Sequence, residues 1–375
     1  MFSQRLDWTQ ARNRISQHLA RRTRPFLDLT GSNPTRAGFH WPAGLLDSLA
    51  SKQALVYEPD SRGMLPARQA VAEYQGVLAE QVLLTASTSE AYSYLFKLLA
   101  NPGDEVLVPR PSYPLFDFLA RLESVQIVQY PLFYDHGWSI DVAALAAAVT
   151  GRTRAIVVVN PNNPTGSYLK LAELRALEAI CQRHDLALIS DEVFADFALG
   201  DGPDWVRFVT GNVRDVPAFS LSGLSKSCGL PQLKVGWIVS NSTEALDRLE
   251  LIADTFLSVS TPVQVALPQL LASRHAIQGQ ILERMRANLG RLSNPLVVEG
   301  GWTAIVRLPS VKSDEDWVLD LLDRYDLLVQ PGFFYDFPPG TAHVVVSLIT
   351  PESDFAEGAA RLDQAFRDAL HSTAR

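Results

Sequence analysis

The segment SLSGLSKSCGLPQLKVGW, from Ser220 to Trp237, holds two lysines, Lys226 and Lys234, eight positions apart. The stretches at its two ends, VPAFSLS and KVGWIVS, are apolar runs of the kind that form buried strands, so both amines fall in a loop between strands. A lysine in such a loop can form a Schiff base with a carbonyl group or neutralise a bound anion. Most loop lysines are only solvated charges, so the interpretation depends on the groups that lie beside them.

Three polar segments, NPNNPTG, SDEVF and SGLSKS, each directly follow a stretch predicted to be a strand. In open α/β sheets, ligands bind beyond the carboxyl ends of the strands. The three segments offer an amide at Asn163, a carboxylate at Asp191 and an amine at Lys226. Taken singly, NPNNPTG is an ordinary cluster of turn residues and Asp191 an ordinary helix cap. Taken together, they indicate a site.

A fourth segment, TASTSEAY, places Thr88 and Ser89 at the start of a predicted helix. Backbone N–H groups and hydroxyls at a helix start suit a phosphate group. The four segments match the needs of pyridoxal phosphate, which requires an amine for a Schiff base, a carboxylate beside its pyridine nitrogen, and donors and a cation for its phosphate. We therefore expect pyridoxal 5'-phosphate as the cofactor.

Six motifs stand in order along nearly the whole chain: YEPDSRG, TASTSEAY, PRPSYPLF, NPNNPTG, SDEVF and SGLSKSCGLPQLKVGW. Each is a weak signal alone, but six in this order are highly specific. By these motifs the chain resembles the fold-type I pyridoxal-phosphate-dependent enzymes, and among them the class I and II aminotransferases. The resemblance implies an aspartate-aminotransferase-like fold and a homodimer that binds a small-molecule amino donor and a keto acceptor.

The resemblance also implies roles for individual residues. Lys226 matches the lysine that forms the internal aldimine and then carries the proton between the substrate's Cα and the cofactor's C4′. Asp191 would pair with the pyridine nitrogen, and Asn163 would donate to the ring's phenolic oxygen. The other implied contacts are to the ring face and the phosphate, and they come from Tyr113, Thr88, Ser89, Ser222, Ser225 and Lys234.

Two of the implied phosphate contacts have special features. Lys234 stands where the family usually has an arginine, so it supplies the charge but not the bidentate fork. Tyr57 matches a tyrosine that reaches the phosphate from a partner subunit, which implies shared active sites.

Two positions depart from the family pattern. Phe194 in SDEVF replaces a tyrosine that donates to the ring's phenolic oxygen, so that oxygen depends more on Asn163. Val345 in AHVVVSLIT aligns with an arginine that grips the substrate's α-carboxylate bidentately. Either Asn33 and Arg36, in the segment SNPTRAG, hold the carboxylate instead, or the substrate is an amine or a larger amino-bearing intermediate that needs no such clamp.

The elements that must position these residues alternate between strand and helix. The predicted strands are QVLLTAS, DEVLVP, SVQIVQYPL, RAIVVVN, LALIS, VPAFSLS and KVGWIVS. The helices expected between them are TSEAYSYLFKLLA, DVAALAAAV and KLAELRALEAICQRH. This alternation predicts an α/β fold whose mostly parallel sheet, of the seven-stranded type by resemblance, is sandwiched by helices.

After this sheet the pattern changes to long helices, EALDRLELIADTFLSV and AIQGQILERMRANLGRL, followed by short strands and a closing helix, DFAEGAARLDQAFRDALH. The strands there are GGWTAIVRLP, LLVQP and AHVVVSLIT, which indicates a smaller α+β domain. We expect residues 46–260 to form the large cofactor-binding domain and 261–375 the small one. Residues 1–45, rich in turn formers, are expected to pack with the small domain.

Composition excludes several classes of protein. The net charge of -8 argues against a nucleic-acid partner, and no stretch approaches the roughly 20 apolar residues of a membrane-spanning helix. The two cysteines, Cys181 and Cys228, provide neither a disulfide framework nor a zinc motif, so no metal site is expected. The charged N-terminus lacks a signal-peptide core. These features predict a cytoplasmic protein that does not bind membranes.

The sequence therefore predicts an aminotransferase that moves an amino group between an amino acid or amine and a keto acceptor through a Lys226 aldimine. A lyase or decarboxylase on the same fold is the alternative, because carboxylate placement helps to choose the bond that is cleaved. A non-catalytic cofactor-binding protein, such as the sensor half of a regulator, is a third hypothesis. It is disfavoured because no helix-turn-helix domain fits in the short N-terminal segment.

We expect the Schiff base on Lys226 to hold its proton to higher pH than in family members with a tyrosine at position 194. Phe194 cannot donate a hydrogen bond to the phenolic oxygen, and such a bond favours the deprotonated imine. A spectral pH titration of the wild type and of Phe194→Tyr measures the difference. A wild-type Schiff-base pKa at or below that of the variant would contradict the expectation.

Overall fold

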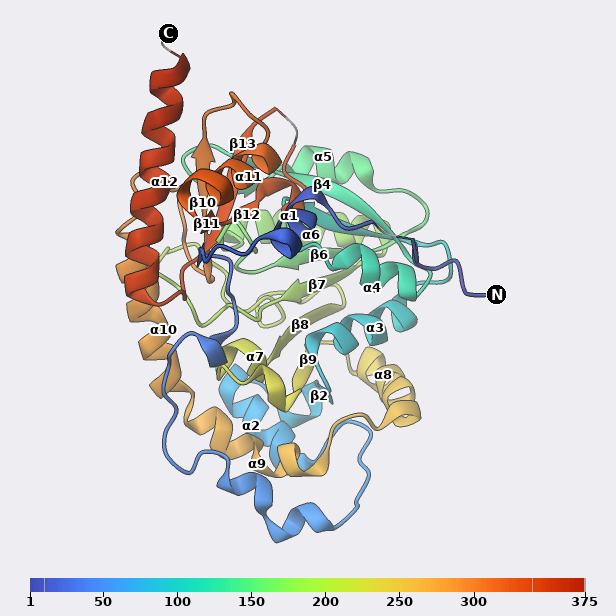
Figure 1. The fold of residues 1–375 in the computed structure, drawn as a ribbon. Coiled ribbons are helices and arrows are strands. Elements are labelled where there is room, and N and C mark those ends of the chain that lie inside the picture. Colours follow the sequence, from blue (N-terminus) through green and yellow to red (C-terminus); the bar gives the residue numbers. More distant parts are fainter. Residues whose placement is uncertain (10, 339, 374–375) are drawn as a thin grey trace.

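The computed structural model describes residues 1–9, 11–338 and 340–373 (Figure 1). Its largest sheet among these residues has eight strands in the order β2-β9-β8-β7-β6-β3-β4-β5. The strands are β2 (Val82–Thr85), β3 (Glu105–Arg110), β4 (Gln126–Tyr134), β5 (Trp138–Ile140), β6 (Thr153–Val159), β7 (Ala187–Asp191), β8 (Ala218–Gly223) and β9 (Gly236–Ser240).

The run from β8 through β7, β6 and β3 to β4 is parallel, whereas β2, β9 and β5 pair antiparallel. The prediction of a mostly parallel sheet is confirmed. The short β5, which forms a hairpin with β4, makes the sheet one strand larger than the seven-stranded type expected.

The central strands are near-continuous apolar runs because helices cover both faces of the sheet. On β6, alternate side chains point to opposite faces, so Val157 joins one core cluster and Ile156 another. The first face is covered by α3 (Thr88–Leu99), α4 (Phe116–Leu122) and α8 (Thr243–Phe256), and the second by α5 (Val142–Ala148) and α6 (Leu171–His184).

A further cluster joins α2 (Leu65–Gln75) and α9 (Thr261–Ala272) to the β2–β9 edge of the sheet. Fully buried Trp237 of β9 belongs to it. The sequence analysis did not predict α9, which has Pro262 in its first turn and Pro268 in its interior. A proline in a helix interior removes a backbone hydrogen bond, so local propensity argues against this helix. Tertiary packing, with Leu267 and Leu270 buried against α2, stabilises it.

The last part of the chain forms a three-stranded antiparallel sheet, ordered β10-β13-β12. Its strands are β10 (Thr303–Leu308), β13 (Ala342–Ser347) and β12 (Gln330–Pro331), and its helices are α10 (Arg274–Leu289), α11 (Asp314–Tyr325) and α12 (Glu352–Thr373). The expected strands and the closing helix are present, whereas α11 was not predicted. Positions 339, 374 and 375 of the expected range 261–375 lie outside the described residues.

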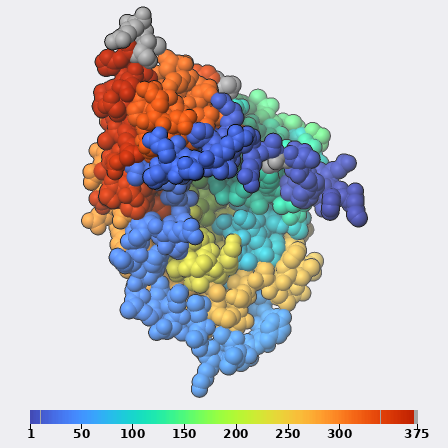
Figure 2. All heavy atoms as spheres, in the orientation of Figure 1, coloured from blue at the N-terminus to red at the C-terminus, as the bar shows by residue number. Residues whose placement is uncertain are grey.

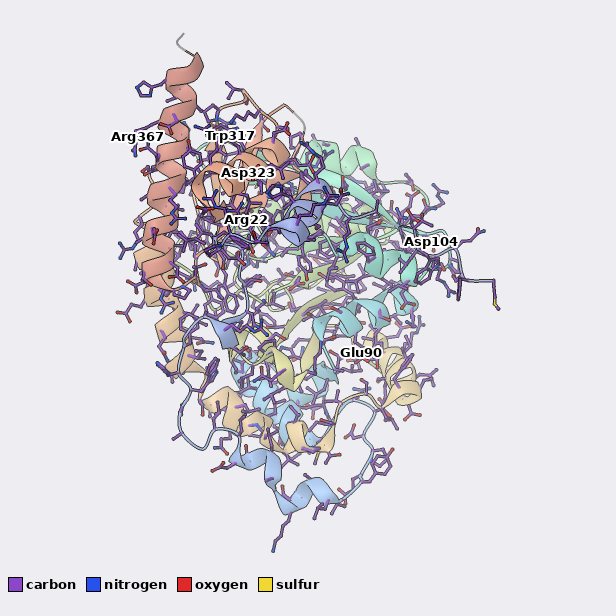
Figure 3. The ribbon with its side chains drawn as sticks, viewed as in Figure 1. Arg22, Glu90, Asp104, Trp317, Asp323 and Arg367 are labelled. Atoms are coloured by element: carbon purple, nitrogen blue, oxygen red, sulfur yellow. The ribbon has the colours of Figure 1, made fainter. Side chains whose placement is uncertain are left out.

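The N-terminal segment lies across these C-terminal elements, as the blue surface beside orange and red shows in Figure 2. Its strand β1 (Leu27–Asp28) pairs in parallel with β11 (Leu327–Leu328). Its helix α1 (Arg14–Arg21) contacts α11, and Arg22 forms an ion pair with Asp323 at 3.7 Å (Figure 3). These contacts bring residues from both ends of the sequence to one side of the large sheet.

The remaining elements are short. They are α7 (Leu224–Ser227) and the 3₁₀ turns η1 (Pro34–Arg36), η2 (Asp47–Ala50), η3 (Lys52–Leu55), η4 (Ala79–Gln81), η5 (Pro231–Leu233) and η6 (Gly332–Tyr335). In the part of the chain that the structure describes, no helix has the length and apolarity needed to cross a membrane. The same residues contain no group of three or more His, Cys, Asp or Glu side chains arranged to hold a metal ion.

Candidate active site

A cavity of about 290 Å³ lies between the carboxyl ends of the central strands and the three-stranded sheet. Val159 at the end of β6, Asp191 at the end of β7 and Lys226 after β8 line its floor. Thr303 of β10 and Ser347 of β13 line the opposite wall. The position agrees with the general rule that ligands of parallel sheets bind beyond the strand ends.

Lys226 lies on α7, the single turn that follows β8. Its Nζ is 4.7 Å from the ring centroid of Trp302 and 5.3 Å from that of Phe194. Burial lowers the pKa of this amine to about 8, while the charge of Asp191 acts in the opposite direction. A larger share of the amine is therefore neutral near pH 7 than in an ordinary lysine, and the neutral amine is the nucleophile towards a carbonyl group.

Asp191 is the last residue of β7 and is buried. The Tyr92 hydroxyl donates to its Oδ2 at 3.1 Å, and the Val193 N–H donates to its Oδ1 at 3.2 Å. Burial raises the pKa of this carboxyl to about 6, although these bonds and Lys226 favour its charged form. Its neighbour Glu192 points elsewhere, accepting from the Ser220 hydroxyl at 2.9 Å. The carboxylate available to the cavity is thus that of Asp191.

The start of α3 forms another part of the cavity wall. Ser87 caps this helix, its hydroxyl accepting from the Glu90 N–H at 3.2 Å, and Thr88 and Ser89 line the cavity. A Cβ added to Gly236 of β9 would lie 2.9 Å from the Thr88 nitrogen, so only glycine permits this close approach. The first-turn N–H groups and two hydroxyls form a site suited to an anion such as phosphate.

Asn163 and Tyr113 complete the set of groups that suit the expected cofactor. Asn163 lines the cavity, and its Oδ1 is buried without a hydrogen-bond partner. Such an unpaired amide is costly unless a ligand or water satisfies it. Tyr113, 41% exposed, lines the cavity with its pKa raised by burial and by Asp191. Amine, carboxylate, amide, aromatic ring and helix start together fit pyridoxal phosphate.

The structure brings seven of the residues singled out from the sequence into one cavity lining. They are Thr88, Ser89, Tyr113, Asn163, Asp191, Ser225 and Lys226.

Five other predicted site residues, all within the described part of the chain, lie outside that cavity lining. Ser222 is buried at the end of β8 with its hydroxyl unpaired, and Lys234 is exposed in a left-handed backbone conformation after η5. Tyr57 is 74% exposed and borders a separate hollow. Asn33 caps η1 by accepting from the Thr35 N–H at 3.1 Å, and exposed Arg36 lies within that turn.

The sequence analysis missed most of the residues that the C-terminal sheet and the N-terminal segment contribute. They are Thr30, Ser32, Trp302, Thr303, Gln330, Phe334, Tyr335, Val346 and Ser347. One signal was available, because side chains two residues apart on a strand share a face. Ser347 follows Val345 by two positions and therefore lies on the face that the expected arginine would have used.

Val345 itself is 1% exposed and packs in an apolar cluster with Ile305 and Tyr335. Phe194 borders the cavity and contacts Trp302 edge to face, with ring centroids 5.4 Å apart. Neither side chain carries a hydrogen-bonding group, so both departures from the family pattern change the polarity of the site.

The family model described as aminotransferase class I and II matches residues 41–339. Alanine aminotransferase of Mycobacterium tuberculosis is 28% identical over 362 residues, covering 88% of this chain and 83% of that protein. Arginine–pyruvate transaminase of Pseudomonas aeruginosa is 30% identical over 321 residues, covering 81% and 80%. Among solved structures, a double mutant of Thermus thermophilus aspartate aminotransferase superposes with a TM-score of 0.84 at 21% identity, covering 97% and 99% of the two chains.

We expect acylation of Lys226 in the cofactor-free protein to rise with pH with a midpoint at about 8, because only the neutral amine reacts and its pKa is lowered from 10.5 to about 8. Asp191→Asn removes the charge that favours the protonated amine, so the midpoint should move to lower pH. Peptide mass spectrometry with an amine-acylating reagent gives the rates, with exposed Lys234 as the internal reference. A midpoint near the ordinary lysine value, or an upward shift in the variant, would contradict this.

Proposed function

The chain belongs to the class I and II aminotransferase family, and from this membership we propose that Lys226 is the residue that holds its cofactor covalently. The protein is a pyridoxal-phosphate-dependent aminotransferase of the aspartate-aminotransferase-like fold. Bound pyridoxal phosphate supplies a ring that accepts electrons, so that an amino group can pass from a donor to a keto acceptor. The observation that carries the proposal for Lys226 is its partly desolvated amine, which lines the cavity together with Asp191.

The other cavity residues have separate proposed tasks. Asp191 would face the pyridine nitrogen, and a positive charge there would favour its carboxylate form. Asn163 would donate to the phenolic oxygen through its Nδ2, while its Oδ1, unpaired in the protein alone, would need a separate donor. Tyr113 would cover one ring face. The phosphate would be held by the start of α3 through Thr88 and Ser89, with Ser222, Ser225 and Lys234 as further contacts taken from the family resemblance.

Lys226 would have a second task once the donor has replaced it on the cofactor. Its Nζ would take the proton from the donor's amine-bearing carbon and carry it to the cofactor's C4′. A general base works best when its pKa lies near the working pH. The lowered pKa of about 8 suits this role better than the 10.5 of a solvated lysine.

Replacing Lys226 by alanine should reduce amino-group transfer about 10³-fold or more, because both the covalent attachment and the base are lost. Borohydride reduction followed by peptide mass spectrometry should find the reduced cofactor on the Lys226 peptide of the wild type. The surface variant Lys52→Ala should keep this adduct. An adduct on a different lysine, or a fully active Lys226→Ala protein, would overturn the assignment.

We also propose that the protein works as a homodimer in which Tyr57 reaches the phosphate of the partner's site. Tyr57 is 74% exposed, and it follows Leu55 and Val56, which are 87% and 54% exposed. A run of exposed apolar side chains is typical of a surface that is covered by another chain. A partner subunit would bury this run and bring the tyrosine into a second cavity.

Mixed dimers of Lys226→Ala and Tyr57→Ala subunits test this arrangement. If Tyr57 acts across the interface, one site of each mixed dimer has both groups intact, and random pairing restores activity to about a quarter of the sites. If Tyr57 acts within its own subunit, no mixed site is intact and no activity returns. Co-expression of the two variants with different tags, followed by activity assays, distinguishes the two results.

We propose the domain division 1–45, 46–260 and 261–375, with one adjustment suggested by packing. Helix α9 contacts α2 beside the large sheet, which favours a boundary between α9 and α10. Limited proteolysis, with mapping of the first cleavage sites, tests that boundary.

We further propose a cytoplasmic location, since Cys181 and Cys228 are both free and buried. Reduced, unpaired cysteines are typical of proteins in reducing compartments. Cell fractionation tests the location.

A further inference from the structure

The wall of the cavity opposite Lys226 is one face of the three-stranded sheet. In the register of this sheet, Thr303 pairs with Ser347, and Val345 lies between Ile305 and Gln330. Because directly opposite residues share a face, these five residues lie on one face of the sheet. Thr303, Gln330 and Ser347 line the cavity, whereas Ile305 and Val345 pack in the adjoining apolar cluster. These five residues have hydroxyl, amide or apolar side chains, and none of them is charged.

The rest of the cavity adds no cation that could bind a carboxylate. Among its described lining residues, Asp191 and Lys226 are the only Asp, Glu, Lys, Arg or His side chains. Under the proposed function Lys226 is committed to the cofactor, and the phosphate brings further negative charge. A donor carboxylate against this wall would lose water without gaining an ion pair, which is strongly unfavourable.

The same wall offers neutral hydrogen-bonding groups. The Ser347 side chain is 3% exposed and lines the cavity, and its hydroxyl has no hydrogen-bond partner. Gln330 lines the cavity, and its amide oxygen accepts from the Tyr335 hydroxyl, which leaves its amide N–H groups as the donors it can offer to a ligand. The Thr303 hydroxyl donates to the Pro164 carbonyl at 3.0 Å. An unpaired buried hydroxyl next to an amide donor suits a neutral oxygen atom of a ligand.

We infer that the amino donor carries a neutral oxygen function, an amide or a hydroxyl, where the usual donor carries its α-carboxylate, and that Ser347 and Gln330 hold this oxygen. The inference rests on the proposed function of Lys226. The apolar lining from Pro114, Leu119 and Phe334 further indicates a donor with an apolar or aromatic side group.

The reaction balances with such a donor. The C–H and C–N bonds of its amine-bearing carbon break, and this carbon is oxidised by two electrons to a carbonyl whose oxygen comes from water. The nitrogen and the two electrons pass to the bound cofactor, and the amine of Lys226 is released. The amide or hydroxyl of the donor is unchanged, so it contributes binding and orientation alone.

The test compares L-phenylalaninamide, L-phenylalaninol and L-phenylalanine in single-turnover reactions with the holoenzyme. We expect the two neutral donors to react at least about 10-fold faster per unit concentration than the amino acid, given the cost of an unpaired carboxylate. Val345→Arg places a cation on the same sheet face and should raise the rate with L-phenylalanine relative to the amide.

Binding without reaction gives an independent readout. Calorimetry with 3-phenylpropanamide and 3-phenylpropanoate, which lack the amine, should show tighter binding of the amide to the wild-type holoenzyme. Ser347→Ala removes one donor and should weaken amide binding about 5-fold, the usual effect of a single neutral hydrogen bond. The matched control Ser353→Ala changes an exposed serine at the start of α12 and should bind both compounds as the wild type does.

The outcomes separate this inference from the proposed function. If L-phenylalanine reacts as fast as the amide, or the carboxylate analogue binds as tightly, the substrate inference fails while transamination stands. If Ser347→Ala binds the amide as the wild type does, the assigned contact is wrong. If Lys226→Ala transfers amino groups like the wild type, the proposed function fails, and the inference that rests on it fails too. If Val345→Arg does not fold, the comparison of amide binding between Ser347→Ala and the wild type still tests the inference.

Discussion

The desolvation of one amine is the constraint on which the rest of the site depends. Water stabilises a charged ammonium group strongly, so a lysine kept largely from water between Trp302 and Phe194 gives up part of its charge. The charge of Asp191, at the end of the neighbouring strand, limits this effect. The balance leaves a lysine that can attack a carbonyl group near neutral pH, which an exposed lysine does poorly.

Two parts of the fold fix the positions of Asp191 and Lys226 in the cavity. The buried parallel strands β7 and β8 fix the backbone on which Asp191 and the Lys226 turn are mounted, through a register in which Asp191 pairs with Leu221. The three-stranded sheet then closes the cavity from the other side. The N-terminal segment secures that sheet, since the Ser347 N–H donates to the Leu29 carbonyl at 2.7 Å. The ends of the chain thus shape a site whose reactive groups come from its middle.

Sequence reasoning could group residues that each stand in a short motif directly after a predicted strand. The strand-ending segments around Asn163, Asp191 and Lys226 have local signals, and the structure places all three on one cavity. Sequence reasoning missed α9, because Pro268 opposes a helix locally and only packing against α2 stabilises it. Asn33 and Arg36 stay predictions as substrate contacts, and the residues of the N-terminal segment in the cavity lining are Thr30 and Ser32.

By itself, the sequence determined which chemical groups this protein has at its strand ends, and therefore its cofactor class and family. Those groups occur in short motifs, and the motifs and their order can be read without knowledge of the fold. Only the tertiary structure decided what faces Lys226 across the cavity. Ser347, Gln330 and Thr303 come to share one face of the sheet through strand register, and whether that face meets the cavity or the core depends on packing between segments far apart in the chain. The resulting neutral wall is a property of that packing, not of any single motif.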